Sequence, residues 1–582
     1  MIKRLQLQSW SKDQLITEIE RLNKRKTYGL VWEEKPEDVV EQSKTELPVL
    51  KEVKSKAITG DKNSPVNILI EGDNYHALSV LNYTHKGKID VIYIDPPYNT
   101  GNKDFRFNDK YVDSEDAYRH SEWLSFMEKR LRLTKHLLTN NGVIFISIDD
   151  NEVAQLKLLM DQPELFGELN FITQFVWEKT QHFGRQKINN YSNCEYVLVY
   201  ARKLVAEKIK ELLVERIQTD FEDAPLYNAS NRENELVFPA NKVIFNIKDG
   251  TYVKTSDTKY KLLKKVVVKK GKNSNDLILS FKSRWSQKTI DEQIKKGATF
   301  WVKSENFAIR VIYGNGRVFR NSPKQIIFTN RNNPFVANDR FGSKVGTTEE
   351  GSAELAEIVG GQNIFDYPKP TSLIRYLLSL YFDHTTAEYK KNATVLDFFA
   401  GSGTTGHAVL QLNKKDGGNR QFILCTNNEN NIATDVCYPR IAKVIKGYKN
   451  TKDETVAGLG GNLRYFHTAF VGAEPNDKNK EALTRQATEM LCMREDTFEL
   501  VGETKGVKIF KNFKKYTGIV FDEGAIPILK KYITKFGGIW SVYIFSLGDD
   551  TFDEEFVDIK QKIKVSPVPE AILKIYRRLF QT

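Results

Sequence analysis

A short apolar strand that stops abruptly at two prolines constrains this chain more than any other stretch. Residues 89–94 are mostly apolar and β-branched, which is typical of a buried strand. The strand must end at Asp95-Pro96-Pro97-Tyr98, because proline has no N–H to donate to a neighbouring strand. Ligands of open α/β sheets bind beyond the carboxyl ends of the strands. We therefore expect Asp95 and Tyr98 to lie at a functional site.

The residue types at this strand end suit a planar amine as the substrate. Asp95 can accept one N–H of an exocyclic amino group, and the carbonyl of Pro96 can accept the other. The ring of Tyr98 offers a flat face on which a base can stack, which is worth roughly 1–3 kcal/mol. The same tetrapeptide could also be no more than a turn that terminates a strand.

A glycine-rich turn follows another apolar strand much later in the chain. Residues 393–396 lead into Asp397-Phe398-Phe399-Ala400-Gly401-Ser402-Gly403, and an apolar helix begins near His407. Glycine lets a backbone approach a ligand closely, and the start of a helix favours negative groups. The turn has neither the dinucleotide-binding order of glycines nor the lysine of a phosphate-binding loop. By itself it is weak evidence for any one ligand.

Together the two motifs resemble the DNA amino-methyltransferases that use S-adenosylmethionine. Residues 95–98 resemble the catalytic motif of that family and residues 398–403 resemble its cofactor motif, in the order found in the β class. Residues 148–152, 365–370 and 491–498 also resemble the modification subunits of type III restriction–modification systems. The resemblance implies methylation of the N6 amino group of a flipped-out adenine, with the tips of the two strands side by side. Aspartate at the first position favours adenine over the N4 amino group of cytosine.

The resemblance also implies a set of site residues. The catalytic ones are Asp95, Pro96, Pro97 and Tyr98, and the cofactor-binding ones are Asp397, Phe399, Ala400, Gly401, Gly403, Lys369, Glu429 and Asp73. Glu429 comes later than the usual ribose-binding acid, and Asp73 could equally cap a helix. The Lys369-Pro370 pair could simply mark a helix start. No metal site is expected, because the four cysteines form no Cys-x-x-Cys pair.

Three expectations concern the surroundings of the catalytic strand. Residues 99–107 mix glycine, amides, basic and aromatic residues, which suits a mobile loop closing over DNA. A helix over residues 121–138 should bury Trp123, Leu124, Met127, Leu131 and Leu138. Asp149 and Asp150 should cap a helix that starts near Asn151.

We expect an α/β fold: a Rossmann-like methyltransferase core with a mixed, mostly parallel sheet, an inserted target-recognition domain and a small C-terminal α/β domain. Between residues 202 and 345 the sequence turns to short strands, lysines and isolated aromatics, which suits phosphate contacts and base stacking. Any one lysine cluster could be ordinary solvated surface. The expected parts are a helix and arm (1–60), a catalytic half (61–201), the target-recognition domain (202–345), a cofactor-binding half (346–470) and the C-terminal domain (471–582).

The net charge of +12 and the pI of about 9.1 favour an anionic partner, most simply double-stranded DNA. The resemblance adds a homodimer, and a separate ATP-dependent restriction subunit as a candidate partner. Without a visible signal peptide or an apolar run of about 18 residues, we expect a cytoplasmic protein with no membrane contact. A solitary regulatory adenine methyltransferase, an N4-cytosine methyltransferase and a DNA-recognition scaffold subunit remain alternatives.

Overall fold

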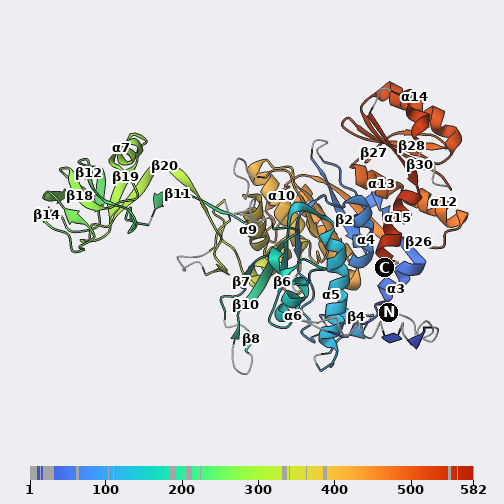
Figure 1. Cartoon of the computed structure of the whole chain (residues 1–582), viewed down its shortest axis with the longest axis horizontal. Coiled ribbons are helices and arrows are strands. Elements are labelled where there is room, and N and C mark those ends of the chain that lie inside the picture. Colours follow the sequence, from blue (N-terminus) through green and yellow to red (C-terminus); the bar gives the residue numbers. More distant parts are fainter. Residues whose placement is uncertain are drawn as a thin grey trace. The chain divides into compact units, whose positions relative to one another are not determined.

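The chain folds into two compact units (Figure 1): residues 1–210 with 324–582, here called the core unit, and residues 211–323, the inserted unit. The structure, a computed structural model, describes residues 10–12, 15–16, 32–60, 64–102, 104–108, 110–113, 115–182, 185–186, 191–204, 213–222, 224–330, 337–339, 341–361, 364–383, 390–547, 552–559 and 562–580. The helix expected within residues 1–60 is predicted from the capping box Ser11-Lys12-Asp13-Gln14, and most of it lies outside these residues. None of the described helices is both long and apolar enough to span a bilayer.

A mixed sheet organises the core unit. Its strand order is β1 (Glu46–Glu52), β26 (Asn462–Gly472), β2 (Val66–Glu71), β23 (Gln421–Thr426), β22 (Thr394–Asp397), β3 (Ile89–Ile94), β6 (Leu138–Ile148), β10 (Cys194–Ala201), β7 (Phe171–Glu178) and β21 (Ile326–Ile327). The strands from β26 to β6 run parallel, whereas β1 pairs antiparallel with β26, and β10 with β6 and β7. The predicted α/β core with a mostly parallel sheet is confirmed.

Two central strands of this sheet come from distant parts of the chain. Strand β22 pairs in parallel with β3, with Val395 opposite Val91 and Leu396 opposite Ile92. Because parallel strands end at the same edge of a sheet, the carboxyl ends of β3 and β22 are neighbours. The expected adjacency of the two strand tips is confirmed.

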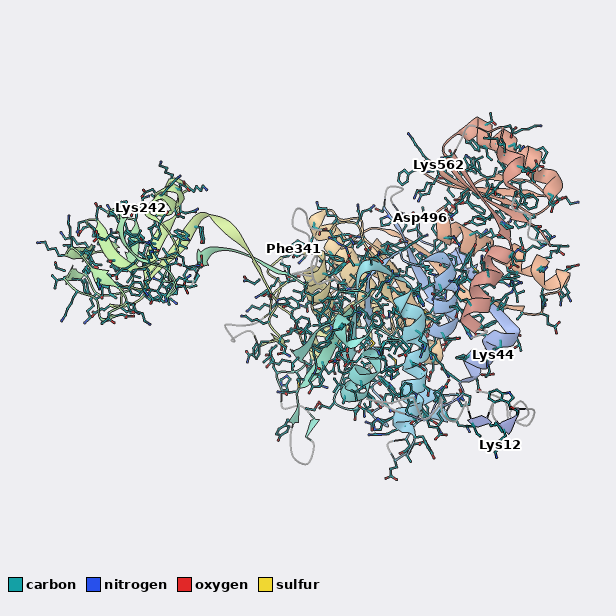
Figure 2. The ribbon with its side chains drawn as sticks, in the orientation of Figure 1. Lys12, Lys44, Lys242, Phe341, Asp496 and Lys562 are labelled. Carbon is teal, nitrogen blue, oxygen red and sulfur yellow. The ribbon has the colours of Figure 1, made fainter. Side chains whose placement is uncertain are left out.

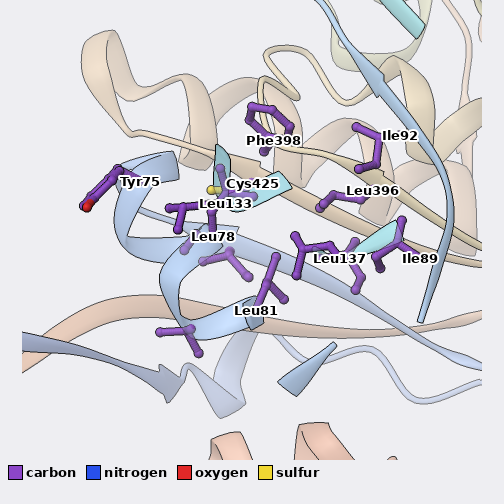
Figure 3. Packing of buried hydrophobic residues seen from close by; sticks show 14 of the residues in the cluster. Tyr75, Leu78, Leu81, Ile89, Ile92, Leu133, Leu137, Leu396, Phe398 and Cys425 are labelled. Atoms are coloured by element: carbon purple, nitrogen blue, oxygen red, sulfur yellow. The ribbon is translucent and has the colours of Figure 1, made fainter. Parts of the chain in front are cut away.

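Helices cover both faces of the sheet and thereby bury the apolar side chains of its central strands. Leu396 and Cys425 pack in one cluster with α4 (Asn74–Thr84) and α5 (Arg119–Lys135), as Figure 3 shows. Side chains alternate between faces, so Leu424 points the other way and lies near Gly406 of α10 (Thr404–Asp416). Helices α9 (Thr371–Phe382), α8 (Thr348–Val359) and α11 (Tyr438–Lys446) pack in the same group as α10.

The N-terminal stretch expected to be an arm contains regular structure. Helix α3 (Asp38–Thr45) leads into β1, which buries residues 47–50 and extends the sheet beyond β26. Pro48 is compatible with a strand because β1 is at the edge of the sheet. Its carbonyl accepts a hydrogen bond from the Tyr576 hydroxyl at 2.6 Å. The apolar run was too short and too closely flanked by charges to be recognised as a strand.

Helix α5 begins and ends slightly earlier than predicted. Trp123, Leu124, Met127 and Leu131 are buried as expected. Leu138, however, opens strand β6 instead of ending the helix. The apolar spacing continued across the short turn at residues 136–137 and therefore concealed the boundary.

The C-terminal part of the core unit is a small α/β arrangement, as predicted. Helices α12 (Asp477–Gln486) and α13 (Thr488–Glu495) precede a sheet of order β27 (Glu499–Glu503), β28 (Val507–Asn512), β29 (Lys515–Val520), β30 (Ile539–Phe545) and β31 (Lys562–Val568). Helix α14 (Ile526–Phe536) follows β29, and α15 (Glu570–Phe580) follows β31. Helices α13 and α15 both contact α4.

The inserted unit has its own hydrophobic core and two sheets. The larger has the order β11 (Glu215–Glu222), β20 (Ile309–Asn321), β19 (Thr299–Val302), β13 (Val243–Phe245), β17 (Lys272–Asn273), β16 (Val266–Lys269) and β14 (Gly250–Tyr252). The smaller joins β12 (Glu233–Phe238), β18 (Leu277–Lys282) and β15 (Lys261–Leu262), and α7 (Gln287–Lys295) lies against β12. This unit falls within the stretch 202–345 in which a separate domain was expected.

Candidate active site

Asp95 and Tyr98 follow strand β3 at the carboxyl ends of the parallel strands, and their two side chains contact each other. The Tyr98 hydroxyl donates to Asp95 Oδ1 at 2.7 Å. The Pro97 carbonyl accepts a hydrogen bond from Trp123 Nε1 at 2.8 Å, which ties the turn to α5. The carboxylate side chain of Asp95 is 26% exposed, so a ligand can still reach it. The turn therefore holds an accessible hydrogen-bond acceptor, the Asp95 carboxylate, and its backbone is fixed to α5.

Lys369, predicted as a cofactor residue, contacts Asp95 and Tyr98. Its ammonium is 2.9 Å from Asp95 Oδ2 and 3.0 Å from the Tyr98 hydroxyl. It stands just before Pro370, the N-cap of α9, and is 7% exposed. Burial alone would lower the pKa of Lys369, but the carboxylates of Asp95 and Glu195 outweigh burial and raise it. The side chain is therefore a fixed positive charge beside Asp95.

Glu195, at the start of β10, completes this group and was not predicted. Its Oε2 lies 3.2 Å from the Lys369 ammonium, and its Oε1 lies 3.1 Å from the Lys179 ammonium. Burial would raise the pKa of Glu195, yet the two ammonium groups hold it below its usual value. The sequence signal was an acidic residue at the start of the apolar run 196–200.

The glycine-rich turn after β22 is organised by Asp397. Asp397 Oδ1 accepts the N–H of Phe399 at 3.0 Å, and Oδ2 accepts the hydroxyl of Thr405. Burial raises the pKa of Asp397 to about 7. Phe399 is half-buried and Ala400 is buried. This carboxylate joins the end of β22 to the first turn of α10.

The two glycines of the turn serve the backbone conformation and the packing of the protein itself. Gly401 and Gly403 have φ values of 48° and 80°, in the left-handed region that favours glycine. A Cβ on Gly401 would lie 2.9 Å from the ring of Phe365, and one on Gly403 would lie 3.1 Å from the sulfur of Cys437. The nearest protein atoms to such a Cβ are thus side chains, and close approach of a ligand to these glycines stays a prediction.

Two predicted cofactor residues, Glu429 and Asp73, already have partners. Glu429 follows β23 and pairs with Arg106 at 2.9 Å. Asp73 caps α4, accepting the N–H of Tyr75 at 2.7 Å, and lies 3.4 Å from Arg130. The helix-cap interpretation of Asp73 is therefore confirmed, and a cofactor role for either carboxylate stays a prediction.

The segment expected to be a mobile loop is packed against the core unit where it is described. Phe105 and Phe107 are buried, and the ring of Phe105 lies 5.2 Å from that of Phe126 on α5. Through Arg106 the same segment reaches Glu429. Lys103 lies outside the described residues.

Comparison with known proteins decides the family. Residues 89–483, more than half of the chain, match the family model described as DNA methylase. This chain belongs to the DNA methylase family. The matched region contains β3, β22 and the inserted unit, which lies between these two strands in the sequence.

Two curated relatives of this DNA methylase agree with the match. The type III restriction–modification enzyme StyLTI Mod subunit of Salmonella typhimurium is 31% identical over 426 residues, covering 68% of this chain and 58% of the relative. The type II methyltransferase M.KpnI of Klebsiella pneumoniae is 30% identical over 401 residues, covering 67% of this chain and 85% of the relative. The match thus spans less than two thirds of the Mod subunit.

This DNA methylase has a second buried carboxylate, Glu152, that was not predicted from the sequence. Asp149 and Asp150 were expected to cap the next helix: Asp149 does accept the N–H of Asn151 at 2.9 Å, whereas Asp150 accepts the Tyr196 hydroxyl at 2.8 Å. The N-cap of α6 (Val153–Met160) is instead Glu152, which is fully buried. Its Oε1 accepts from Asn99 Nδ2 at 2.6 Å and lies 2.7 Å from His120 Nδ1. Because Asn99 follows Tyr98 directly, Glu152 anchors the turn that carries Asp95 and Tyr98.

Replacing Glu152 by glutamine should flatten the pH dependence of stability. Burial raises the pKa of Glu152 to about 8, and its Oε2 has no hydrogen-bond partner among the described residues. An acid with a raised pKa stabilises the folded state at low pH, and that stability is lost as pH rises through the folded pKa. The difference in melting temperature, Glu152→Gln minus wild type, should therefore be more positive at pH 8.5 than at pH 5 by roughly 1–4 °C.

Differential scanning fluorimetry across this pH range measures the difference directly. Glu41→Gln, which changes a carboxylate that is 56% exposed, is the matched control and should follow the wild type at each pH. A constant difference between Glu152→Gln and the wild type from pH 5 to pH 8.5 would contradict the prediction.

Proposed function

We propose that this DNA methylase is a site-specific adenine methyltransferase that transfers a methyl group from S-adenosylmethionine to the N6 amino group. The observation that carries the proposal is the pairing of β22 with β3, which sets Asp95 beside the Asp397 turn. One strand end supplies an acceptor for an amine, and its neighbour supplies a cofactor turn. A methyl donor and an amino group held at these two strand ends would meet.

The residues around the β22 turn fit a bound S-adenosylmethionine, which supplies an electrophilic methyl group. Glu429 follows β23, the strand next to β22, and its side chain is 31% exposed, so its carboxylate can accept hydroxyl groups of a ribose. The half-buried ring of Phe399 offers an apolar surface for a base. Asp397, Ala400, Gly401 and Gly403 form the turn, and Lys369 and Asp73 are the remaining proposed pocket residues.

In the proposed reaction Asp95 accepts one N–H of the adenine amine and the Pro96 carbonyl accepts the other. This orients the nitrogen lone pair out of the ring plane towards the methyl group. As the N–C bond formed, the methyl–sulfur bond would break, S-adenosylhomocysteine would leave, and the proton lost from the nitrogen would pass to water. The ring of Tyr98 stacks on the base, and Pro97 fixes the turn through Trp123. The base must leave the duplex to reach Asp95, which costs a few kcal/mol. Alignment of the reacting atoms can offset about 7–11 kcal/mol of the barrier.

The inserted unit is the proposed target-recognition domain. It contains 21 lysine and arginine residues against 13 aspartate and glutamate residues, so it carries +8 of the chain's net charge of +12. Lys264, Lys265, Lys269, Lys270 and Lys272, on and beside β16, are all exposed. Figure 2 shows the side chains of this unit around Lys242. Such a surface suits contacts with DNA phosphates.

The Mod relative supports a proposal about the type of system to which this chain belongs. The StyLTI relative is named as a subunit of a type III restriction–modification enzyme. We infer that this chain is likewise a modification subunit, able to act as a homodimer and to associate with a separate restriction subunit. The name of M.KpnI, a type II methyltransferase, keeps a solitary methyltransferase as the second candidate.

A methyl-transfer assay tests the proposal. The purified chain is incubated with duplex DNA and S-adenosylmethionine carrying a trideuterated methyl group, and the digested nucleosides are analysed by mass spectrometry. Labelled N6-methyladenine is the expected product. Labelled N4-methylcytosine would assign the other base, and no labelled nucleoside with several genomic DNAs would contradict catalysis.

A further inference from the structure

One buried lysine at the candidate site is shared by two carboxylates. The ammonium of Lys369 lies 2.9 Å from Asp95, 3.2 Å from Glu195 and 3.0 Å from the Tyr98 hydroxyl. An ammonium has three N–H groups, so these contacts use all of them. Lys369 therefore has no donor left for a further ligand unless one of the contacts is released.

Glu195 is held in place from its other side. Its Oε1 contacts the Lys179 ammonium at 3.1 Å, and its residue position on β10 is opposite Trp177 on β7. The Tyr98 hydroxyl lies 3.1 Å from Glu195 Oε2, so its single proton can go to Glu195 or to Asp95. Glu195 thus touches both groups that hydrogen-bond to Asp95.

The charges of this group balance. Asp95 and Glu195 carry two negative charges, and Lys369 and Lys179 carry two positive ones. The side chains of Lys369 and Glu195 are 7% and 9% exposed, so water screens their interaction poorly. If Glu195 were neutral, Lys369 would have Asp95 as its one charged partner in this group and would bind it more tightly.

We propose that Glu195 is a positioning residue for methyl transfer, because it gives Lys369 and Tyr98 a second anchor and leaves Asp95 able to receive the amine of the base. The inference rests on the proposed adenine methyltransferase function. When an amine donates to Asp95, Lys369 can shift its hydrogen bond towards Glu195 without losing its counter-ion. In this proposal Glu195 contacts neither the base nor the methyl donor, and it acts mainly through Lys369, with its contact to the Tyr98 hydroxyl as the smaller part.

Glu195→Gln keeps the size of the side chain and removes its charge. We expect single-turnover methylation of DNA to slow by roughly 10- to 100-fold, while the dissociation constants for DNA and S-adenosylmethionine stay within about 3-fold. Glu178→Gln is the matched control, because Glu178 ends the neighbouring strand and, among the described residues, its carboxylate is hydrogen-bonded to Thr329 and Asn330. This control should methylate at the wild-type rate.

A double-mutant cycle separates positioning from simple damage. If Glu195 acts through Lys369, the double variant Glu195→Gln/Lys369→Gln should be no more than about 3-fold slower than Lys369→Gln alone. Independent structural damage would instead multiply the two losses. The pH–rate profile adds a second readout: the negative charge of Glu195 raises the pKa of Asp95, so the acidic limb should move to lower pH in Glu195→Gln.

The outcomes distinguish the inference from the function on which it rests. Multiplied losses, or a wild-type rate for Glu195→Gln, would overturn the role of Glu195 while leaving adenine methylation intact. A wild-type chain that forms no N6-methyladenine would overturn both. Should Glu195→Gln fail to fold, Glu195→Asp keeps the charge but withdraws the carboxylate, and a wild-type rate for that variant would equally count against the inference.

Discussion

Asp95→Ala should abolish methyl transfer while leaving DNA binding intact. The substitution removes the proposed acceptor for the amine and one of the two carboxylates that hold Lys369. A catalytic group of this kind commonly contributes on the order of 10²–10⁴ to the rate. We expect a loss of that size in single-turnover methylation. DNA affinity should change by less than about 3-fold, because most of the chain's net positive charge lies in the inserted unit.

Asp90→Ala provides the control on the same strand. The carboxylate of Asp90 accepts the N–H of Thr394 at 2.9 Å and pairs with Lys390, at the opposite end of β3 from Asp95. This variant should bind and methylate DNA at wild-type rates per folded molecule, even if it melts at a lower temperature. Parallel loss of DNA binding and methylation in Asp95→Ala would contradict the proposed separation of catalysis from DNA binding.

Asp397→Ala should weaken binding of S-adenosylmethionine by at least about 10-fold. The substitution leaves the N–H of Phe399 and the hydroxyl of Thr405 without their acceptor. An unsatisfied buried polar group costs roughly 1–3 kcal/mol, so the turn should lose its fixed conformation. Isothermal titration calorimetry with S-adenosylmethionine measures the effect without any need for DNA.

Asp397→Asn separates the loss of the hydrogen bonds from the loss of the charge. Asparagine can accept from Phe399 and donate to Thr405, so the turn should persist. Burial raises the pKa of Asp397 to about 7, so the wild type loses stability as pH rises from about 4 to 7 and the asparagine variant should not. Undiminished cofactor binding by Asp397→Ala would remove this turn from the cofactor site.

The two strand tips could be predicted because each carries its own local signal. Two prolines end β3, and glycines with left-handed backbones follow β22. The pairing of these strands is a tertiary contact that no local pattern encodes. It was inferred from the family resemblance, and the sheet confirms it.

The partners of the catalytic motif could not be predicted for the same reason. Glu195 lies on β10 and Lys369 in the segment just before α9, and only folding brings their side chains together at Asp95. Glu152 was overlooked because the preceding pair Asp149-Asp150 gave a stronger helix-cap signal. The edge strand β1 was missed because its apolar core is only four residues long. In each case the fold, and not the local sequence, decides the environment of the residue.

Sequencing of methylated bases tests the central claim most directly. The chain and its Asp95→Ala and Asp397→Ala variants are expressed in a bacterial host without adenine methylation of its own, and the genomic DNA is read by single-molecule sequencing. We predict N6-methyladenine at one short recognition sequence with the wild-type chain and at none with either variant. N4-methylcytosine in place of N6-methyladenine, or adenine methylation that persists in both variants, would contradict the account.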